Sequence, residues 1–239
     1  ISCQYELKRR NLSVLPNYLH IGVAKAASTF LWAMYKEHPD IYAPPRADNC
    51  SFFVCAYHRG LEWYEKTYFS EWAGEKAVGE FSNCYMLFEP ALVRIARDLP
   101  GVKLSVTLRN PIDTTFLQWA QNKQHSFWLG DWAKRDPAFE RTLLNSWQSF
   151  RAWPELGFFA DQLKKVYRHF PKERVLVMLY DDLVSDAKVF VQRFFDFLEV
   201  DASFVPSQLD TVIGFPGTGG KDTDEGDLAR GLSPELRTT

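Results

Sequence analysis

Short apolar runs alternate along the chain with segments in which apolar residues recur every three or four positions. The short runs predict buried strands at about residues 18–23, 76–80, 102–108 and 174–180. Helical spacing predicts a helix of about ten residues that ends at His38-Pro39, and further helices at about 60–69, 87–99, 111–123, 157–170 and 185–198. Alternating strands and helices are typical of an α/β fold, with a central parallel sheet and helices on both faces.

The break between the first strand and its helix is the strongest local feature. Residues 18–31, YLHIGVAKAASTFL, place small residues around Lys25 and then the hydroxyl groups of Ser28 and Thr29. Unpaired amide groups and the helix dipole both favour an anion at such a helix start. The pattern therefore predicts strand, phosphate loop and helix.

Polar residues also follow the other predicted strands. In parallel sheets, ligands bind outside the carboxyl ends of the strands. We therefore expect Lys25, Glu80, Arg109 and the loop after Tyr180 to meet at one edge of the sheet.

Length and composition favour one domain over residues 1–239. A chain of 239 residues that is 46% apolar and 15% aromatic can bury a full core. Residues 1–16 are interpreted as an N-terminal extension. Residues 214–239 are Gly-rich and charged, and two interpretations stay open for them, a lid over the site or a flexible tail.

The charge and the apolar runs limit the partners. A formal net charge of −2 argues against nucleic-acid binding and favours a small molecule or a glycan. No run approaches the roughly 20 apolar residues of a membrane span. Because the chain starts at Ile1 without methionine, we interpret it as processed or trimmed, so that an upstream anchor or targeting segment can be missing.

Four cysteines, at positions 3, 50, 55 and 84, fit no zinc pattern. Buried free thiols are the first interpretation, and a Cys50–Cys55 bridge is the alternative.

Five segments, in order, carry a resemblance to a known family. They are 16–42 (PNYLHIGVAKAASTFLWAMYKEHPDIY), 52–69 (FFVCAYHRGLEWYEKTYF), 77–85 (AVGEFSNCY), 106–119 (VTLRNPIDTTFLQW) and the helix–strand–helix of 157–200. Together they resemble the PAPS-dependent sulfotransferase superfamily, in the branch of heparan-sulfate-type Golgi enzymes and bacterial relatives. The chain has no Gly-Lys-Ser/Thr run, which argues against P-loop kinases and nucleoside triphosphate hydrolases.

The resemblance implies a P-loop-like three-layer sandwich and a reaction. The family transfers a sulfuryl group from 3′-phosphoadenosine 5′-phosphosulfate (PAPS) to a hydroxyl or amine and releases adenosine 3′,5′-bisphosphate (PAP), without a metal. The acceptor expected here is a glycan or a small metabolite. The location implied is the cytoplasm for a bacterial protein and the Golgi lumen for a trimmed eukaryotic domain, and the oligomeric state is left open.

The same resemblance assigns the donor site. Lys25 is expected to neutralise the 5′-phosphate and the charge that develops on the bridging oxygen. Ser28, Thr29 and the amides of Ala26 and Ala27 are expected to hold the 5′-phosphate. Two further donor ligands are expected, Arg109 at the 3′-phosphate and Lys221 from the Gly-rich tail.

Two positions of the donor site depart from the family. Ala27 stands where the loop usually has glycine, so the backbone can approach the phosphate only if this position needs no positive φ. Leu117 replaces a serine that binds the 3′-phosphate in the family, and Thr114, one helical turn earlier, is the candidate substitute.

The third departure concerns the catalytic base. The heparan-type enzymes have a glutamate shortly before the Phe-Phe pair, and this chain has Asn49 there, which cannot accept a proton. A hydroxyl acceptor needs a proton acceptor within hydrogen-bond reach. Glu80, Asp48 and His58 are the three candidates. The alternative function is a catalytically impaired, sulfotransferase-like binding protein.

Overall fold

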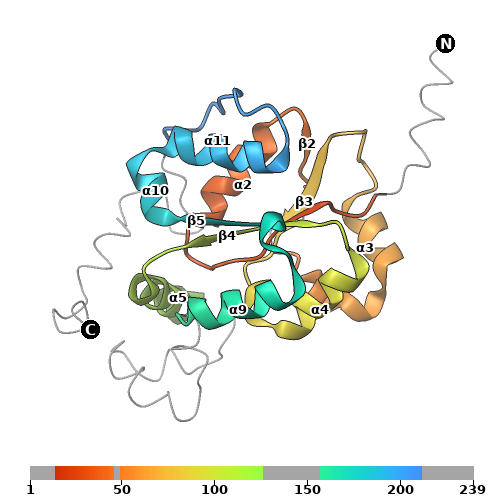
Figure 1. Ribbon diagram of the computed structural model, residues 1–239, viewed down its shortest axis with the longest axis horizontal. Coiled ribbons are helices and arrows are strands. Elements are labelled where there is room, and N and C mark those ends of the chain that lie inside the picture. Colours follow the sequence, from red (N-terminus) through yellow and green to blue (C-terminus); the bar gives the residue numbers. More distant parts are fainter. Residues whose placement is uncertain (1–13, 46–48, 126–156, 212–239) are drawn as a thin grey trace, which may run out of the picture.

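The computed structural model describes residues 14–45, 49–125 and 157–211. Five parallel strands form one sheet in the order β2-β3-β1-β4-β5 (Figure 1). Their bounds are Tyr18–His20 (β1), Ile41–Tyr42 (β2), Ala77–Phe81 (β3), Lys103–Leu108 (β4) and Val175–Leu179 (β5). The central position of β1, between β3 and β4, places the segment that follows it in the middle of the carboxyl edge.

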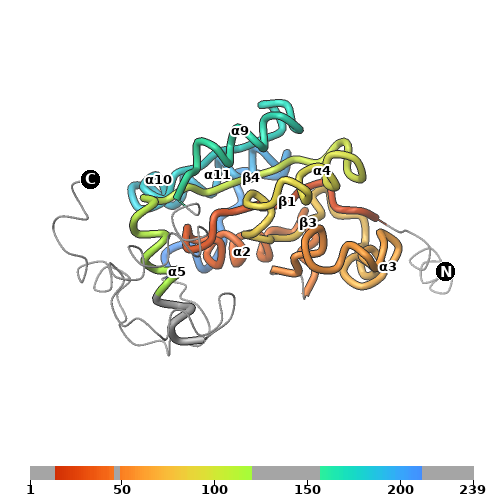
Figure 2. The backbone as a smooth tube through the Cα atoms, turned by 90° about the horizontal axis from the view of Figure 1, so that it is seen from below, coloured from red at the N-terminus to blue at the C-terminus, as the bar shows by residue number. Residues whose placement is uncertain are grey.

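Helices cover both faces of this sheet. In Figure 1, α2 and α11 lie on one face and α4, α5 and α9 on the other. The helices are α2 (Ser28–Glu37), α3 (Leu61–Tyr68), α4 (Glu89–Asp98), α5 (Pro111–His125), α9 (Phe159–His169), α10 (Tyr180–Ser185) and α11 (Ala187–Leu198). Figures 1 and 2 both place the starts of α5 and α10 at the same end of the sheet, which is the carboxyl end of β4 and β5. The expected three-layer α/β architecture is confirmed.

Alternation along the strands builds two cores. Leu19 of β1 belongs to the core under α4 and α9, and its neighbour Tyr18 belongs to the core under α2 and α11. Both side chains are fully buried, as expected for a sheet covered on both faces. Gly79 allows β3 to approach β1, because a Cβ at this position would lie 2.1 Å from the Tyr18 carbonyl oxygen.

The predicted elements are found close to their expected limits. Elements that were not predicted are the short strand β2, helix α10, the π-helical turn η1 (Phe52–Ala56) and the 3-10 turns η2 (Tyr57–Arg59), η3 (Tyr85–Leu87) and η4 (Lys172–Arg174). Each spans six residues or fewer, which is too short to show a period. Asp186 is the N-cap of α11, and its carboxylate accepts a hydrogen bond from the Val189 amide at 2.9 Å.

Parts of the predicted organisation lie outside the described residues. These are the N-terminal extension up to residue 13 and the Gly-rich tail from residue 214. The single-domain assignment stays a prediction. Within the ranges described, no helix is both long and apolar enough to cross a membrane.

Candidate active site

The loop between β1 and α2 has the backbone of an anion site. Lys25 and Ala27 both adopt left-handed conformations, with φ of 65° and 63°. Turns that contain such residues gather amide N–H groups on one side and form anion-binding concavities. Ala27 is the N-cap of α2 and has no side-chain oxygen to occupy the amides of the first turn. Ser28 and Thr29 begin the helix, so their hydroxyl groups lie beside these amides.

The condition that position 27 needs no positive φ is not met in the structure. The loop requires a positive φ at this position, and alanine adopts it. Left-handed backbone costs an L-residue about 1 to 2 kcal/mol because its Cβ approaches the following carbonyl oxygen. The chain therefore builds the loop without the family's glycine, at a cost in stability.

Arg109 joins the loop to two other elements. It follows β4, and its Nη1 donates a hydrogen bond to the Lys25 carbonyl oxygen at 3.3 Å. Its guanidinium carbon lies 4.2 Å from the centroid of the Tyr180 ring, where α10 begins. Lys25, Arg109 and Tyr180 thus meet at the carboxyl edge as expected, whereas Glu80, also expected there, is buried and contacts none of them in any described hydrogen bond.

Leu117, which replaces the family's serine, and Thr114, its candidate substitute, both lie on α5. Leu117 is buried, with 4% of its surface exposed. The Thr114 hydroxyl donates a hydrogen bond to the Asn110 carbonyl oxygen at 3.0 Å. The role of Thr114 as a phosphate ligand stays a prediction.

Glu80, the first candidate base, lies in the core. Its side chain is fully buried, and three hydroxyl groups donate hydrogen bonds to it. Tyr64 and Tyr85 donate to Oε1 at 3.1 and 2.6 Å, and Ser82 donates to Oε2 at 2.7 Å. Burial raises the pKa of Glu80 to about 7, and hydrogen bonds from these three hydroxyl groups and from the Cys50 thiol oppose that rise only in part. These contacts give Glu80 a structural role in the core. Its role as a base stays a prediction.

The partners of Glu80 in turn hold the segment that contains Asn49. The Ser51 amide donates to the Ser82 hydroxyl at 2.9 Å, and the Phe53 amide donates to the Tyr85 hydroxyl at 3.3 Å. The Asn49 amide donates to the Phe81 carbonyl oxygen at 2.6 Å. The buried carboxyl therefore fixes, through two hydroxyl groups, the position of the segment in which the family has its base.

Three sequence candidates remain, Asp48, Lys221 and His58. Asp48 and Lys221 lie outside the described residues, so their roles stay predictions. His58 is exposed, in the 3-10 turn Tyr57–Arg59 that precedes α3. Its role as a base also stays a prediction.

Asn83 is a site residue that the sequence analysis missed. Its Nδ2 donates hydrogen bonds to the Ser28 hydroxyl at 3.1 Å and to Asn49 Oδ1 at 3.2 Å. One carboxamide thus links the phosphate loop to the residue at the family's base position. Its place just after β3, at the carboxyl edge, is the signal that could have identified it.

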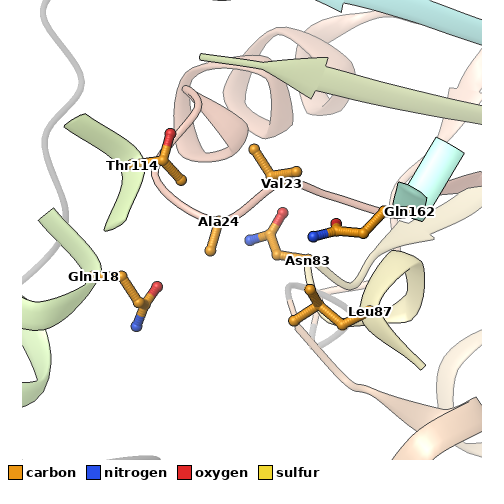
Figure 3. Close-up of a pocket in the computed structure, with 7 residues that line it drawn as sticks. All are labelled: Val23, Ala24, Asn83, Leu87, Thr114, Gln118 and Gln162. Carbon is orange, nitrogen blue, oxygen red and sulfur yellow. The ribbon is translucent and has the colours of Figure 1, made fainter. Parts of the chain in front are cut away.

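A small, partly open pocket adjoins the loop immediately before Lys25. Figure 3 shows its lining from four parts of the chain: the loop, the segment after β3, α5 and α9. The lining residues are Val23, Ala24, Asn83, Leu87, Thr114, Gln118 and Gln162. Gln118 and Gln162 were not predicted as site residues, because nothing in their local sequence distinguishes them from other helical glutamines.

The described residues contain no group of three or more His, Cys, Asp or Glu side chains placed to bind a metal ion. Cys50, Cys55 and Cys84 are free thiols, so the structure does not have the alternative Cys50–Cys55 bridge. The expected burial is wrong for Cys55, which is exposed, and Cys50 and Cys84 are half-buried. Cys3 lies outside the described residues.

Comparison with known proteins decides the family. The sequence profile described as "Sulfotransferase domain" matches residues 16–214. The chain belongs to the sulfotransferase family. Heparan sulfate glucosamine 3-O-sulfotransferase 3B1 of Mus musculus is 29% identical over 195 residues, which cover 77% of this chain and 46% of the relative. Heparan sulfate glucosamine 3-O-sulfotransferase 6 of Homo sapiens is 30% identical over 186 residues, covering 77% and 52%. This sulfotransferase chain spans about half the length of these relatives.

Solved structures agree on the fold. A sulfotransferase from Alicyclobacillus acidocaldarius superposes with a TM-score of 0.72 at 24% identity, covering 94% of this chain and 91% of that one. The mouse sulfotransferase SULT7A1, solved in complex with PAP, superposes with a TM-score of 0.53 at 12% identity, covering 97% and 84%. These similarities show that this sulfotransferase has the fold of its family.

Proposed function

We propose that this sulfotransferase transfers a sulfuryl group from PAPS to a hydroxyl or amine of a glycan or small metabolite. The observation that carries the proposal is the contact of Arg109 with the Lys25 carbonyl oxygen at the start of α2. It places two basic residues at a helix N-terminus, and PAPS has two separate phosphate groups. The resemblance of the loop and of the Arg-Asn-Pro segment to those of the family supports the same donor.

The loop residues fit the 5′-phosphate of PAPS, which carries the oxygen that bridges to the sulfuryl group. Amides of the loop and the hydroxyl groups of Ser28 and Thr29 supply neutral donors to its oxygens, and Lys25 supplies charge. In the transfer, the bond from sulfur to the bridging phosphate oxygen breaks as the bond from sulfur to the acceptor forms. Lys25 stabilises the negative charge that grows on that bridging oxygen.

Arg109 fits the 3′-phosphate. Its planar fork binds phosphate in a bidentate manner, and the Tyr180 ring restricts its orientation. The acceptor must lose a proton as it is sulfated. Glu80, Asp48 and His58 stay the candidates for the proton acceptor.

Calorimetry with two nucleotides tests the donor assignment. The chain is expected to bind PAP more tightly than adenosine 5′-monophosphate, which lacks the 3′-phosphate. Lys25→Ala should weaken the binding of both nucleotides by at least about tenfold, because a charge-assisted hydrogen bond is lost. The same variant should abolish sulfuryl transfer. Lys164→Ala removes an exposed lysine on α9 and is the matched control. Absence of PAP binding, or unchanged transfer by Lys25→Ala, would refute the proposal.

Asn49 favours a second candidate function, a sulfotransferase-like protein that binds its ligands with impaired catalysis. Asn49 stands at the family's base position, and its Oδ1 accepts a hydrogen bond from Asn83 Nδ2. A carboxamide at this position cannot take a proton from the acceptor. Asn49→Glu distinguishes the two. If the protein is impaired only because the base is lost, this variant should raise transfer by about a hundredfold. If another residue is the base, the variant should leave the rate unchanged or lower it.

A further inference from the structure

The pocket beside the phosphate loop has a uniform chemistry. Its seven described lining residues carry no charge, and three of them, Asn83, Gln118 and Gln162, are carboxamides. In Figure 3 the amide nitrogen of Gln162 is directed toward Asn83, and Gln118 lies across the hollow on α5. Leu87 and Val23 supply apolar surface between these groups. The lining therefore combines amides that donate and accept hydrogen bonds with aliphatic walls.

The pocket is directly connected to the donor loop. Val23 and Ala24 immediately precede Lys25, so one wall of the pocket is the first part of the loop itself. Asn83 forms another wall, and its Nδ2 is hydrogen-bonded to the Ser28 hydroxyl. A molecule in this pocket would lie beside the residues proposed to hold the phosphosulfate end of PAPS.

We infer that this pocket is the acceptor subsite and that it takes an uncharged hydroxyl compound, such as a neutral sugar or alcohol. The inference rests on the proposed function and names the substrate class of the same site. Hydroxyl groups donate and accept hydrogen bonds, as carboxamides do, so each side satisfies the other. Aliphatic walls fit the carbon skeleton of such a compound.

A sulfated or carboxylated glycan does not match this lining. Removing an anionic group from water is costly unless a cation or several donors compensate it, and the lining residues offer no lysine or arginine. The chain as a whole is formally −2, so its field does not attract a polyanion. The curated relatives that the chain resembles are named for heparan sulfate, so the inference separates this protein from them in its acceptor.

Transfer of ³⁵S from labelled PAPS tests the inference with two kinds of probe. The uncharged probes are n-octyl β-D-glucopyranoside, 4-nitrophenyl β-D-glucopyranoside and methyl α-D-mannopyranoside. The polyanionic probe is heparan sulfate. The wild-type chain should label at least one uncharged probe and leave heparan sulfate unlabelled.

Two variants make the test specific to the pocket. Gln118→Lys and Gln118→Glu each place a charge in the lining and should raise KM for the uncharged probe by about tenfold, with PAP affinity within twofold of the wild type. Gln192→Lys places the same charge on α11, away from the pocket, and should change neither value. Retained PAP affinity also shows that each variant is folded.

The outcomes separate this inference from the donor assignment. Labelling of heparan sulfate at a rate equal to or above that of the uncharged probes would overturn the inference. So would an unchanged KM in both Gln118 variants, or no labelling of any uncharged probe by a chain that binds PAP. Failure of the wild-type chain to bind PAP would instead refute the proposed function.

Discussion

The guanidinium group of Arg109 lies over the ring of Tyr180, with its central carbon 4.2 Å from the ring centroid. The two residues come from different strand ends, because Arg109 follows β4 and Tyr180 follows β5. The ring limits the orientations of the fork that is proposed to hold the 3′-phosphate. Tyr180 is therefore proposed as a positioning residue.

Removing this ring should reduce recognition of the 3′-phosphate. Tyr180→Ala is expected to lower the ratio of PAP to adenosine 5′-monophosphate affinity by about fivefold, the loss of one cation–π contact. Tyr180→Phe keeps the ring and should retain the ratio. Calorimetric titration with both nucleotides measures it. Equal loss of affinity for the two nucleotides in Tyr180→Ala would assign the tyrosine to general stability instead.

Glycine at position 27 should stabilise the protein. Ala27 has a φ of 63°, and glycine adopts this conformation without the steric cost of a Cβ. The gain is partly offset by the greater freedom of glycine in the unfolded chain, so we expect Ala27→Gly to raise the free energy of unfolding by up to about 1 kcal/mol. Urea denaturation measures the change.

The control for this substitution lies in the same helix. Ala33 is inside α2, so Ala33→Gly should lower the free energy of unfolding by about 1 kcal/mol. If both variants were destabilised alike, the left-handed backbone at position 27 would carry no cost.

Glu80 should make stability depend on pH near neutrality. Its pKa is about 7 in the folded protein, above its ordinary value of 4.5, because burial disfavours the carboxylate. The folded chain therefore holds a proton that the unfolded chain has released. Stability is fully present below about pH 4.5 and falls as pH rises to about 7, by on the order of 3 kcal/mol.

Glu80→Gln removes this titration and keeps a side chain of the same shape. The variant should gain stability relative to the wild type as pH rises from 5 to 7, and the difference should level off above pH 7. Urea denaturation at pH 5, 6, 7 and 8 measures both curves. Glu173→Gln, at an exposed position, is the control and should follow the wild type. Parallel curves for Glu80→Gln and the wild type would show that Glu80 does not titrate in this range.

Gly79 is expected to be essential for the sheet. A Cβ at this position would meet the Tyr18 carbonyl oxygen at 2.1 Å, and both are backbone groups of paired strands that cannot move independently. Gly79→Ala should lower the free energy of unfolding by about 3 kcal/mol or more. Gly101→Ala meets no atom within 4 Å and is the matched control. Thermal denaturation of the two variants compares them, and similar melting temperatures would contradict the proposed contact.

Features that lie within one continuous segment could be predicted from the sequence. Small residues around Lys25, followed by Ser28 and Thr29, predicted the phosphate loop because strand, loop and helix are local structures. The parallel arrangement then placed Arg109 near Lys25, since the carboxyl ends of parallel strands share an edge. The environment of Glu80 was not predictable, because its three hydroxyl partners come from α3, η3 and the segment after β3.

The pattern of residues along the chain thus predicts the architecture, the phosphate loop and the candidates for the donor site. The side chains that surround them depend on tertiary packing. It buried Glu80, set Ala27 in a left-handed conformation, placed Tyr180 against Arg109 and brought Asn83, Gln118 and Gln162 around one pocket. Periodicity records which face of an element is apolar, whereas the contacts between elements depend on how those faces pack across the sheet.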